Sequence, residues 1–242
     1  MPQDPIPFEP GFPGDWPVRP ANSLQLDWRA HTRNFIHLWM PEGISTRSEP
    51  AAPLFILNEV ADYRFSRPQE GLWVQEFTKP GVLSLRGECR DIANGVSLSL
   101  RVTNFSGRPW EGVIGGVCVQ LAAAPDFTDP DRERTFGTAD GKLIRMGEPR
   151  GFQGLTQHFS PATAPTENFI CVESREPGFV LAQWWEGDGR FVGGNCHRSI
   201  TCIHAPPDFG DIGPGQSVER TGRLYLMLGS AADALERYKD EG

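Results

Sequence analysis

Apolar and polar residues alternate along most of this chain in short runs, which is the pattern of half-buried β-strands. Turn residues separate the runs, and the spacing of an amphipathic helix is rare. The predicted strands cover residues 24–28, 34–39, 54–60, 72–77, 82–90, 96–102, 113–121, 168–173, 179–185, 200–204 and 223–228. Many short strands without helices between them predict an all-β fold, an antiparallel β-sandwich.

Two hairpins are predicted from dipeptides that accept positive φ. Leu83–Cys89 and Val96–Val102 both alternate, and Asn94-Gly95 lies between them. Asp140-Gly141 has the same property and predicts a second hairpin within residues 135–144. Such dipeptides favour the tight turns that join neighbouring antiparallel strands.

The two ends of the chain differ from its middle. The first twenty residues hold seven prolines, which exclude a helix and predict an extended arm over residues 1–22. The arm either lies across its own domain or docks on a partner subunit in a homo-oligomer. Residues 23–242 are expected to form one β-sandwich domain. Near the C-terminus, Ser230 can cap a short helix that includes Leu235 and Tyr238, and this helix is expected at the sheet edge.

Composition and the lack of certain motifs exclude several classes of partner and enzyme. A net charge of −8 argues against nucleic acid, which is bound by clustered basic residues. The five cysteines are odd in number and have no paired C-x-x-C spacing, so reduced thiols are expected. No leader pattern or apolar run of about 18 residues is present, so we expect a cytoplasmic protein without a membrane partner. The motifs of serine hydrolases, nucleotide hydrolases and dinucleotide-binding oxidoreductases are also missing.

Reactive side chains are concentrated between Trp184 and Asp211. In the predicted strand at 200–204, alternation places Cys202 and His204 on one face and Ile203 on the other. We therefore expect the functional site in this region.

The segment Gly95–Trp110, an alternating strand that ends in Thr103-Asn104, resembles the sugar-binding supersandwich proteins of the galactose mutarotase-like group. The resemblance implies a supersandwich with a broad concave sheet suited to carbohydrate. In the aldose epimerases of that group, the next strand carries a histidine general acid. The corresponding run here, Val113–Val119, has no histidine, so their mutarotase chemistry is not carried over.

A metal-free acid/base site is the first hypothesis for the cluster. His204 or His197 would move a proton, with Glu186 or Glu173 as the partner carboxylate. The substrate-binding residues would be Arg198 for an anionic group, Trp184 or Trp185 as an aromatic platform, and Asp208 in the following loop.

A metal site is the second hypothesis. Cys202 and His204 offer a thiolate and an imidazole, the usual ligands of zinc or copper, and Cys196 and His197 lie nearby. No established ligand spacing is present, and a third donor such as His158 would have to come from elsewhere. No cofactor is therefore expected under the first hypothesis, and zinc or copper under the second.

These observations lead to three functional alternatives. The chain is a carbohydrate-active protein that binds a sugar or uronate and transfers protons, as an epimerase, lyase or hydrolase does. Alternatively, it is a non-catalytic module that binds a glycan or a protein, or a metal-dependent β-fold enzyme built on Cys202 and His204.

Overall fold

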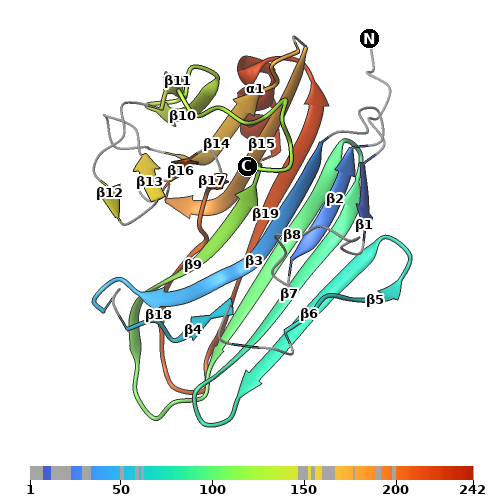
Figure 1. The fold of residues 1–242 in the computed structure, drawn as a ribbon. Helices are drawn as coiled ribbons and strands as arrows, with labels where there is room; N and C mark the ends of the chain where they lie inside the picture. Colours follow the sequence, from blue (N-terminus) through green and yellow to red (C-terminus); the bar gives the residue numbers. More distant parts are fainter. Residues whose placement is uncertain are drawn as a thin grey trace.

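The protein is described by a computed structural model that covers residues 8–11, 23–28, 34–49, 52–57, 60, 63–146, 152–153, 156–159, 167–176, 178–188, 192–197 and 200–241. Over these residues two antiparallel sheets form a sandwich, with one helix at its upper end (Figure 1). The predicted all-β sandwich is confirmed. No helix in the described part of the chain is long and apolar enough to cross a bilayer.

The first sheet has ten described strands, and β3, β9 and β17 lie at its centre. In spatial order it contains β1 (Phe8–Gly11), β2 (Leu24–Trp28), β3 (Phe35–Thr46), β9 (Trp110–Gln120), β17 (Ile200–His204), β16 (Gly193–His197), β13 (Thr156–Phe159) and β12 (Phe152–Gln153); β18 (Asp208–Ile212) also pairs with β9, and β4 (Phe55–Ile56) with β3.

The second sheet has nine described strands. Their order is β11 (Lys142–Arg145), β10 (Thr135–Ala139), β14 (Glu167–Glu173), β15 (Phe179–Asp188), β19 (Ser217–Leu228), β8 (Gly95–Asn104), β7 (Leu83–Ile92), β6 (Leu72–Lys79) and β5 (Ser66–Gln69).

The main core lies between the two sheets. Alternate residues of each central strand point into it, such as Leu38 of β3, Val119 of β9 and Ile203 of β17 from the first sheet. Leu98 and Trp185 approach from the second sheet. Burial of this apolar surface is the main favourable contribution to folding. The intervening residues of β3, β9 and β17 therefore point to the opposite face of the first sheet.

Both predicted hairpins are confirmed. In the second one, Asp140 and Gly141 both have positive φ and join β10 to β11. In the first one, pairing of β7 with β8 already begins at Ile92 opposite Gly95, so the turn itself is Ala93-Asn94, one residue earlier than expected. Asn94 has a φ of 63°, the conformation for which asparagine is suited.

The C-terminal helix α1 (Ala231–Glu241) begins after Ser230 as predicted. Ser230 and Asp233 bond to each other's backbone N–H, which is a capping box. The helix does not lie at a sheet edge. Leu235 and Tyr238 pack instead on the outer face of the second sheet, over Trp184 of β15 and its neighbours.

Of the predicted N-terminal arm, the structure describes only β1. This strand pairs antiparallel with β2 of the same chain, in register from Phe8 opposite Trp28 to Gly11 opposite Gln25. Residues 1–7 and 12–22 lie outside the described part. Docking of the arm on a partner subunit stays a prediction.

Candidate functional site

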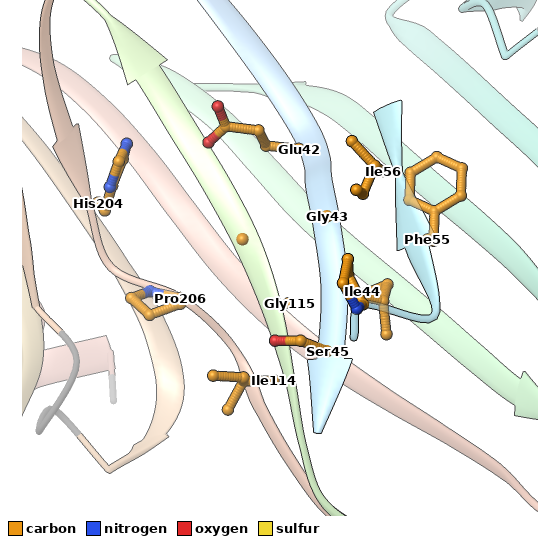
Figure 2. A pocket seen from close by; sticks show the side chains of 12 residues that line it. Glu42, Gly43, Ile44, Ser45, Phe55, Ile56, Ile114, Gly115, His204 and Pro206 are labelled. Carbon is orange, nitrogen blue, oxygen red and sulfur yellow. The ribbon is translucent and has the colours of Figure 1, made fainter. Parts of the chain in front are cut away.

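A pocket with a volume of about 330 Å³ lies on the face of the first sheet opposite the core. Its walls come from segments far apart in the sequence: Glu42 to Ser45 of β3, Phe55 and Ile56 of β4, Ile114 to Gly116 of β9, and His204 and Pro206 at the end of β17. Figure 2 shows the Glu42 carboxylate extending from β3 toward the side of the pocket where His204 lies. The β3 wall contributes one ionisable group, Glu42, and the β17 wall contributes another, His204; both are half-buried.

A bulge in β3 positions Glu42. Trp39 pairs with Cys118 of β9, but the next aligned pair is Gly43 with Gly116, so β3 contains extra residues between them. Such bulges re-aim side chains and are common beside functional sites. Here the bulge is the local feature that brings a carboxylate to the pocket.

Two glycines of β9 form the floor between Glu42 and His204. A Cβ atom on Gly116 would lie 3.7 Å from the Glu42 Cβ and 3.5 Å from the backbone nitrogen of Gly43, on the pocket side. A Cβ atom on Gly115 would point the other way, to 3.1 Å from the ring of the core residue Phe209. The lack of a side chain at Gly116 leaves room between the two ionisable groups.

Behind His204 lies a chain of polar contacts. The Cys202 sulfur is 3.2 Å from Nε2 of His204, and the Asn195 amide Nδ2 donates to the same sulfur at 3.2 Å. Asn195 belongs to β16 and pairs directly with Cys202 in the sheet. The predicted shared face of Cys202 and His204 is confirmed, since Ile203 lies in the main core.

Cys118 of β9 completes this group. It pairs directly with His204 across the sheet, and its sulfur, the Cys202 sulfur and an imidazole nitrogen of His204 all lie within 4.8 Å of one another. Both thiols are free and buried. Cys118, Cys202 and His204 form the Cys/His cluster.

The ionisation of these groups is interdependent. A hydrogen bond from Cys118 lowers the pKa of Cys202 well below that of a free thiol; burial opposes this, and His204 and Asn195 add to it. The same hydrogen bond, together with burial, raises the pKa of Cys118. Burial lowers the pKa of His204, but the charge and hydrogen bond of Cys202 and the charge of Glu42 outweigh it and bring it to about 9.

Burial also raises the pKa of Glu42. The positive charge of His204 lowers it in part, and the negative charge of Cys202 raises it further. Desolvation disfavours a charged carboxylate, so Glu42 holds a proton more readily than an exposed glutamate does. A carboxyl group tuned in this direction is suited to proton transfer near neutral pH.

Chemically, the arrangement can move protons. Glu42 and His204 reach the pocket, whereas the Cys202 thiol is only 1% exposed. A nucleophile must touch its substrate, so Cys202 is placed to act through His204 rather than to attack a bound molecule.

The structure brings together only part of the predicted site. Trp184 is buried under α1, and Trp185 is buried in the main core, so neither indole faces this pocket. They do lie on opposite faces of β15, as alternation requires. Glu186 is exposed on the second sheet, where it accepts hydrogen bonds from Thr221. Glu173 accepts a hydrogen bond from the first backbone N–H of α1.

The remaining predicted residues have other surroundings. Asp208 on β18 forms an ion pair with Arg47 at 3.4 Å. His197 ends β16, and His158 on β13 pairs with Asn195, but the structure describes only the backbone of these two histidines. The same holds for Cys196, and Arg198 lies outside the described residues.

Sequence reasoning missed Glu42 and Cys118. The predicted strand at 34–39 ended before Pro41, whereas β3 continues through the bulge to Thr46. Cys118 could have been found from its place in the alternation, because Gly116, Cys118 and Gln120 alternate with the core valines 117 and 119. The pattern therefore places Cys118 on the non-core face of β9, where a site residue is expected.

Comparisons with known proteins agree with this architecture. No protein-family model matches the sequence, and no curated protein matches it either. Solved structures do match. The Slr1438 protein from Synechocystis sp. PCC 6803 superimposes with a TM-score of 0.55 at 7% identity, covering 86% of this chain and 89% of the other.

A galactose mutarotase related enzyme from Lactobacillus acidophilus gives a TM-score of 0.52 at 12% identity, over 90% of this chain and 99% of that one. Identities this low establish a common fold and leave the chemistry to be argued from the site. The chain therefore has the fold of the galactose mutarotase-like proteins, as the resemblance of Gly95–Trp110 had indicated.

Proposed function

We propose that this protein binds a sugar or uronate in the pocket between β3, β9 and β17 and catalyses proton transfer on it. The observation that carries the proposal is the convergence of Glu42 and His204 on one open pocket. The fold shared with a galactose mutarotase related enzyme supports a carbohydrate as the ligand. Pocket volume agrees, because about 330 Å³ is within the usual range for small-molecule sites.

Glu42 is the proton-moving group in this proposal. Its carboxylate takes a proton from a hydroxyl or carbon of the bound sugar. The resulting carboxylic acid then returns the proton as the product forms. The His204 wall polarises the sugar oxygen on which negative charge develops. Two groups of complementary character that line one small pocket can act as base and acid on the same sugar.

The apolar part of the pocket fits the non-polar faces of a pyranose. The half-buried side chains of Ile56 and Ile114 line it beside the polar groups. Sugars bind through both kinds of surface, with hydrogen bonds fixing orientation and C–H groups packing on apolar side chains.

The test is a screen of aldoses, ketoses and uronates in D2O by proton NMR. The spectra report anomer interconversion and deuterium incorporation at carbon in the same sample, and saturation-transfer spectra report binding. We expect acceleration for at least one sugar class, and a loss of about 100-fold or more in Glu42→Gln. His204→Asn should also lose activity.

The matched control is Glu236→Gln, the same substitution at an exposed position on α1. It should retain the activity of the wild-type protein. Binding without exchange or interconversion for any sugar would identify a non-catalytic binding module instead. Equal rates for the wild-type protein and Glu42→Gln would remove Glu42 from the mechanism.

A further inference from the structure

We propose that Cys118, Cys202 and His204 together bind one zinc ion, held at the His204 wall of the pocket. This inference deepens the proposed function, because a zinc ion there would supply the electrophile that polarises the sugar oxygen. Zinc binding itself does not depend on the sugar chemistry.

The donor atoms are close to the arrangement that zinc requires. Tetrahedral zinc with its usual bond lengths separates two sulfurs by about 3.8 Å, and a sulfur from a nitrogen by about 3.6 Å. In the structure, the Cys202 sulfur is 3.2 Å from His204 Nε2, and all three donor atoms fall within 4.8 Å of one another. Side-chain shifts of about 1 Å or less would therefore form the site.

Sheet register favours a metal over a disulfide for the two cysteines. Cys118 pairs directly with His204, and Cys202 pairs with Gln120, so the two cysteines are diagonal neighbours. Diagonal positions in a sheet are about 7 to 8 Å apart, beyond the usual Cα separation of a disulfide. A metal ion bridges the longer gap because each sulfur bonds to the ion rather than to the other sulfur.

The surroundings provide the outer hydrogen bonds that metal ligands commonly have. Asn195 donates its amide to the Cys202 sulfur at 3.2 Å. Its own side-chain oxygen is buried and has no hydrogen-bond partner among the described residues. A hydrogen bond from Asn195 to a ligand sulfur would fix the orientation of that ligand, as outer partners do at metal sites.

Charge balance is compatible with a divalent ion. The two thiols are almost fully buried, and two thiolates without a counter-ion would be costly there. A zinc ion neutralises both. Sulfur and imidazole ligands select zinc or copper over magnesium or calcium, and two thiolates, one imidazole and an open fourth position form a known type of catalytic zinc site.

Glu42 lines the same pocket as His204. Its carboxylate interacts electrostatically with each member of the Cys/His cluster. A carboxylate next to a zinc-bound oxygen can remove a proton from it. In this way the proton-moving group of the proposed function and the proposed ion share one pocket.

The experiment uses the full untagged chain, expressed with zinc in the medium and analysed by mass spectrometry for metals. We expect about one zinc per chain. The metal-free protein is then titrated with cobalt(II), which replaces zinc and absorbs light through thiolate-to-cobalt charge transfer. The wild-type protein should show this absorption at one equivalent of cobalt, and zinc should remove it.

Cys118→Ala and Cys202→Ala should lose the charge-transfer absorption, and Asn195→Ala should weaken cobalt binding about 10-fold to 100-fold. The matched control is Cys171→Ala, which removes an equally buried thiol from the cluster under α1 and should leave cobalt binding unchanged. Circular dichroism checks the fold of each variant.

A folded metal-free wild-type protein that shows no thiolate-to-cobalt absorption would overturn the proposal, whatever the variants do. Absorption retained in both cysteine variants would overturn it as well. The cobalt readout contains no sugar, so its failure is distinguishable from failure of the NMR screen. Cobalt binding without sugar turnover would leave the zinc site standing and remove the proposed function.

Discussion

Gly115 and Gly116 are adjacent in β9, yet the structure predicts opposite consequences for the same substitution. A Cβ atom at Gly115 would lie 3.1 Å from both the Phe209 ring and the Pro207 side chain in a packed interior. A Cβ atom at Gly116 would have its nearest neighbours at 3.5 to 3.7 Å, which is ordinary van der Waals contact. Neither glycine has a positive φ, so alanine is compatible with both backbone conformations.

The magnitudes follow from these distances. Gly115→Ala forces Phe209 or Pro207 to move, and overpacking of this kind costs about 1 to 3 kcal/mol. Gly116→Ala meets no such obstacle, and it reduces the conformational entropy of the unfolded chain, a gain of about 0.4 to 1 kcal/mol. In a protein of this size about 1 kcal/mol corresponds to roughly 2 to 4 °C in Tm.

We therefore expect Gly115→Ala to melt roughly 2 to 12 °C below the wild-type protein, and Gly116→Ala to melt at the same temperature or up to about 4 °C higher. Thermal and urea denaturation followed by circular dichroism measure both. Gly116→Ala should nevertheless bind sugars more weakly, since its methyl group enters the pocket between Glu42 and His204. Equal destabilisation by the two variants would refute the assignment of opposite faces.

Four further substitutions test the fold. Asn104→Ala removes the amide that donates to two backbone carbonyls at 2.9 Å and accepts from the Ser106 backbone. We expect the free energy of unfolding, measured by urea denaturation, to fall by about 2 to 4 kcal/mol. A loss below about 1 kcal/mol would contradict this role. Trp185→Ala empties a fully buried position and should cost about 3 to 5 kcal/mol, and a near-neutral result would show that the indole is not in the core. Ser230→Ala removes the helix cap and should cost about 1 kcal/mol, with Asp233→Ala giving a similar loss if the capping box is reciprocal.

Alternation predicted the local geometry correctly where a strand is regular. It placed Cys202 and His204 on one face of β17 and sent Ile203 to the core, because successive side chains point to opposite sides of a strand. Turn-forming dipeptides predicted both hairpins for an equally local reason, since the φ of Asn94 and that of Asp140 depend on the residue itself.

The partners of His204 could not be predicted from the residues next to it in the sequence. Glu42 and Cys118 belong to β3 and β9, which reach β17 only through long-range pairing of the sheet. The bulge after Trp39 also breaks the alternation that would have marked Glu42 as outward-facing. Conversely, Trp184 and Trp185 are near His204 in sequence but lie in the other sheet, so proximity along the chain was misleading there.

The position of the pocket on the non-core face of the first sheet bears on protein engineering. Mutational libraries restricted to outward-facing residues of β3, β9 and β17, with Leu38, Val119 and Ile203 kept constant, would vary ligand preference while preserving the hydrophobic interior. Such a scaffold separates the positions that determine folding from those open to selection for new specificities.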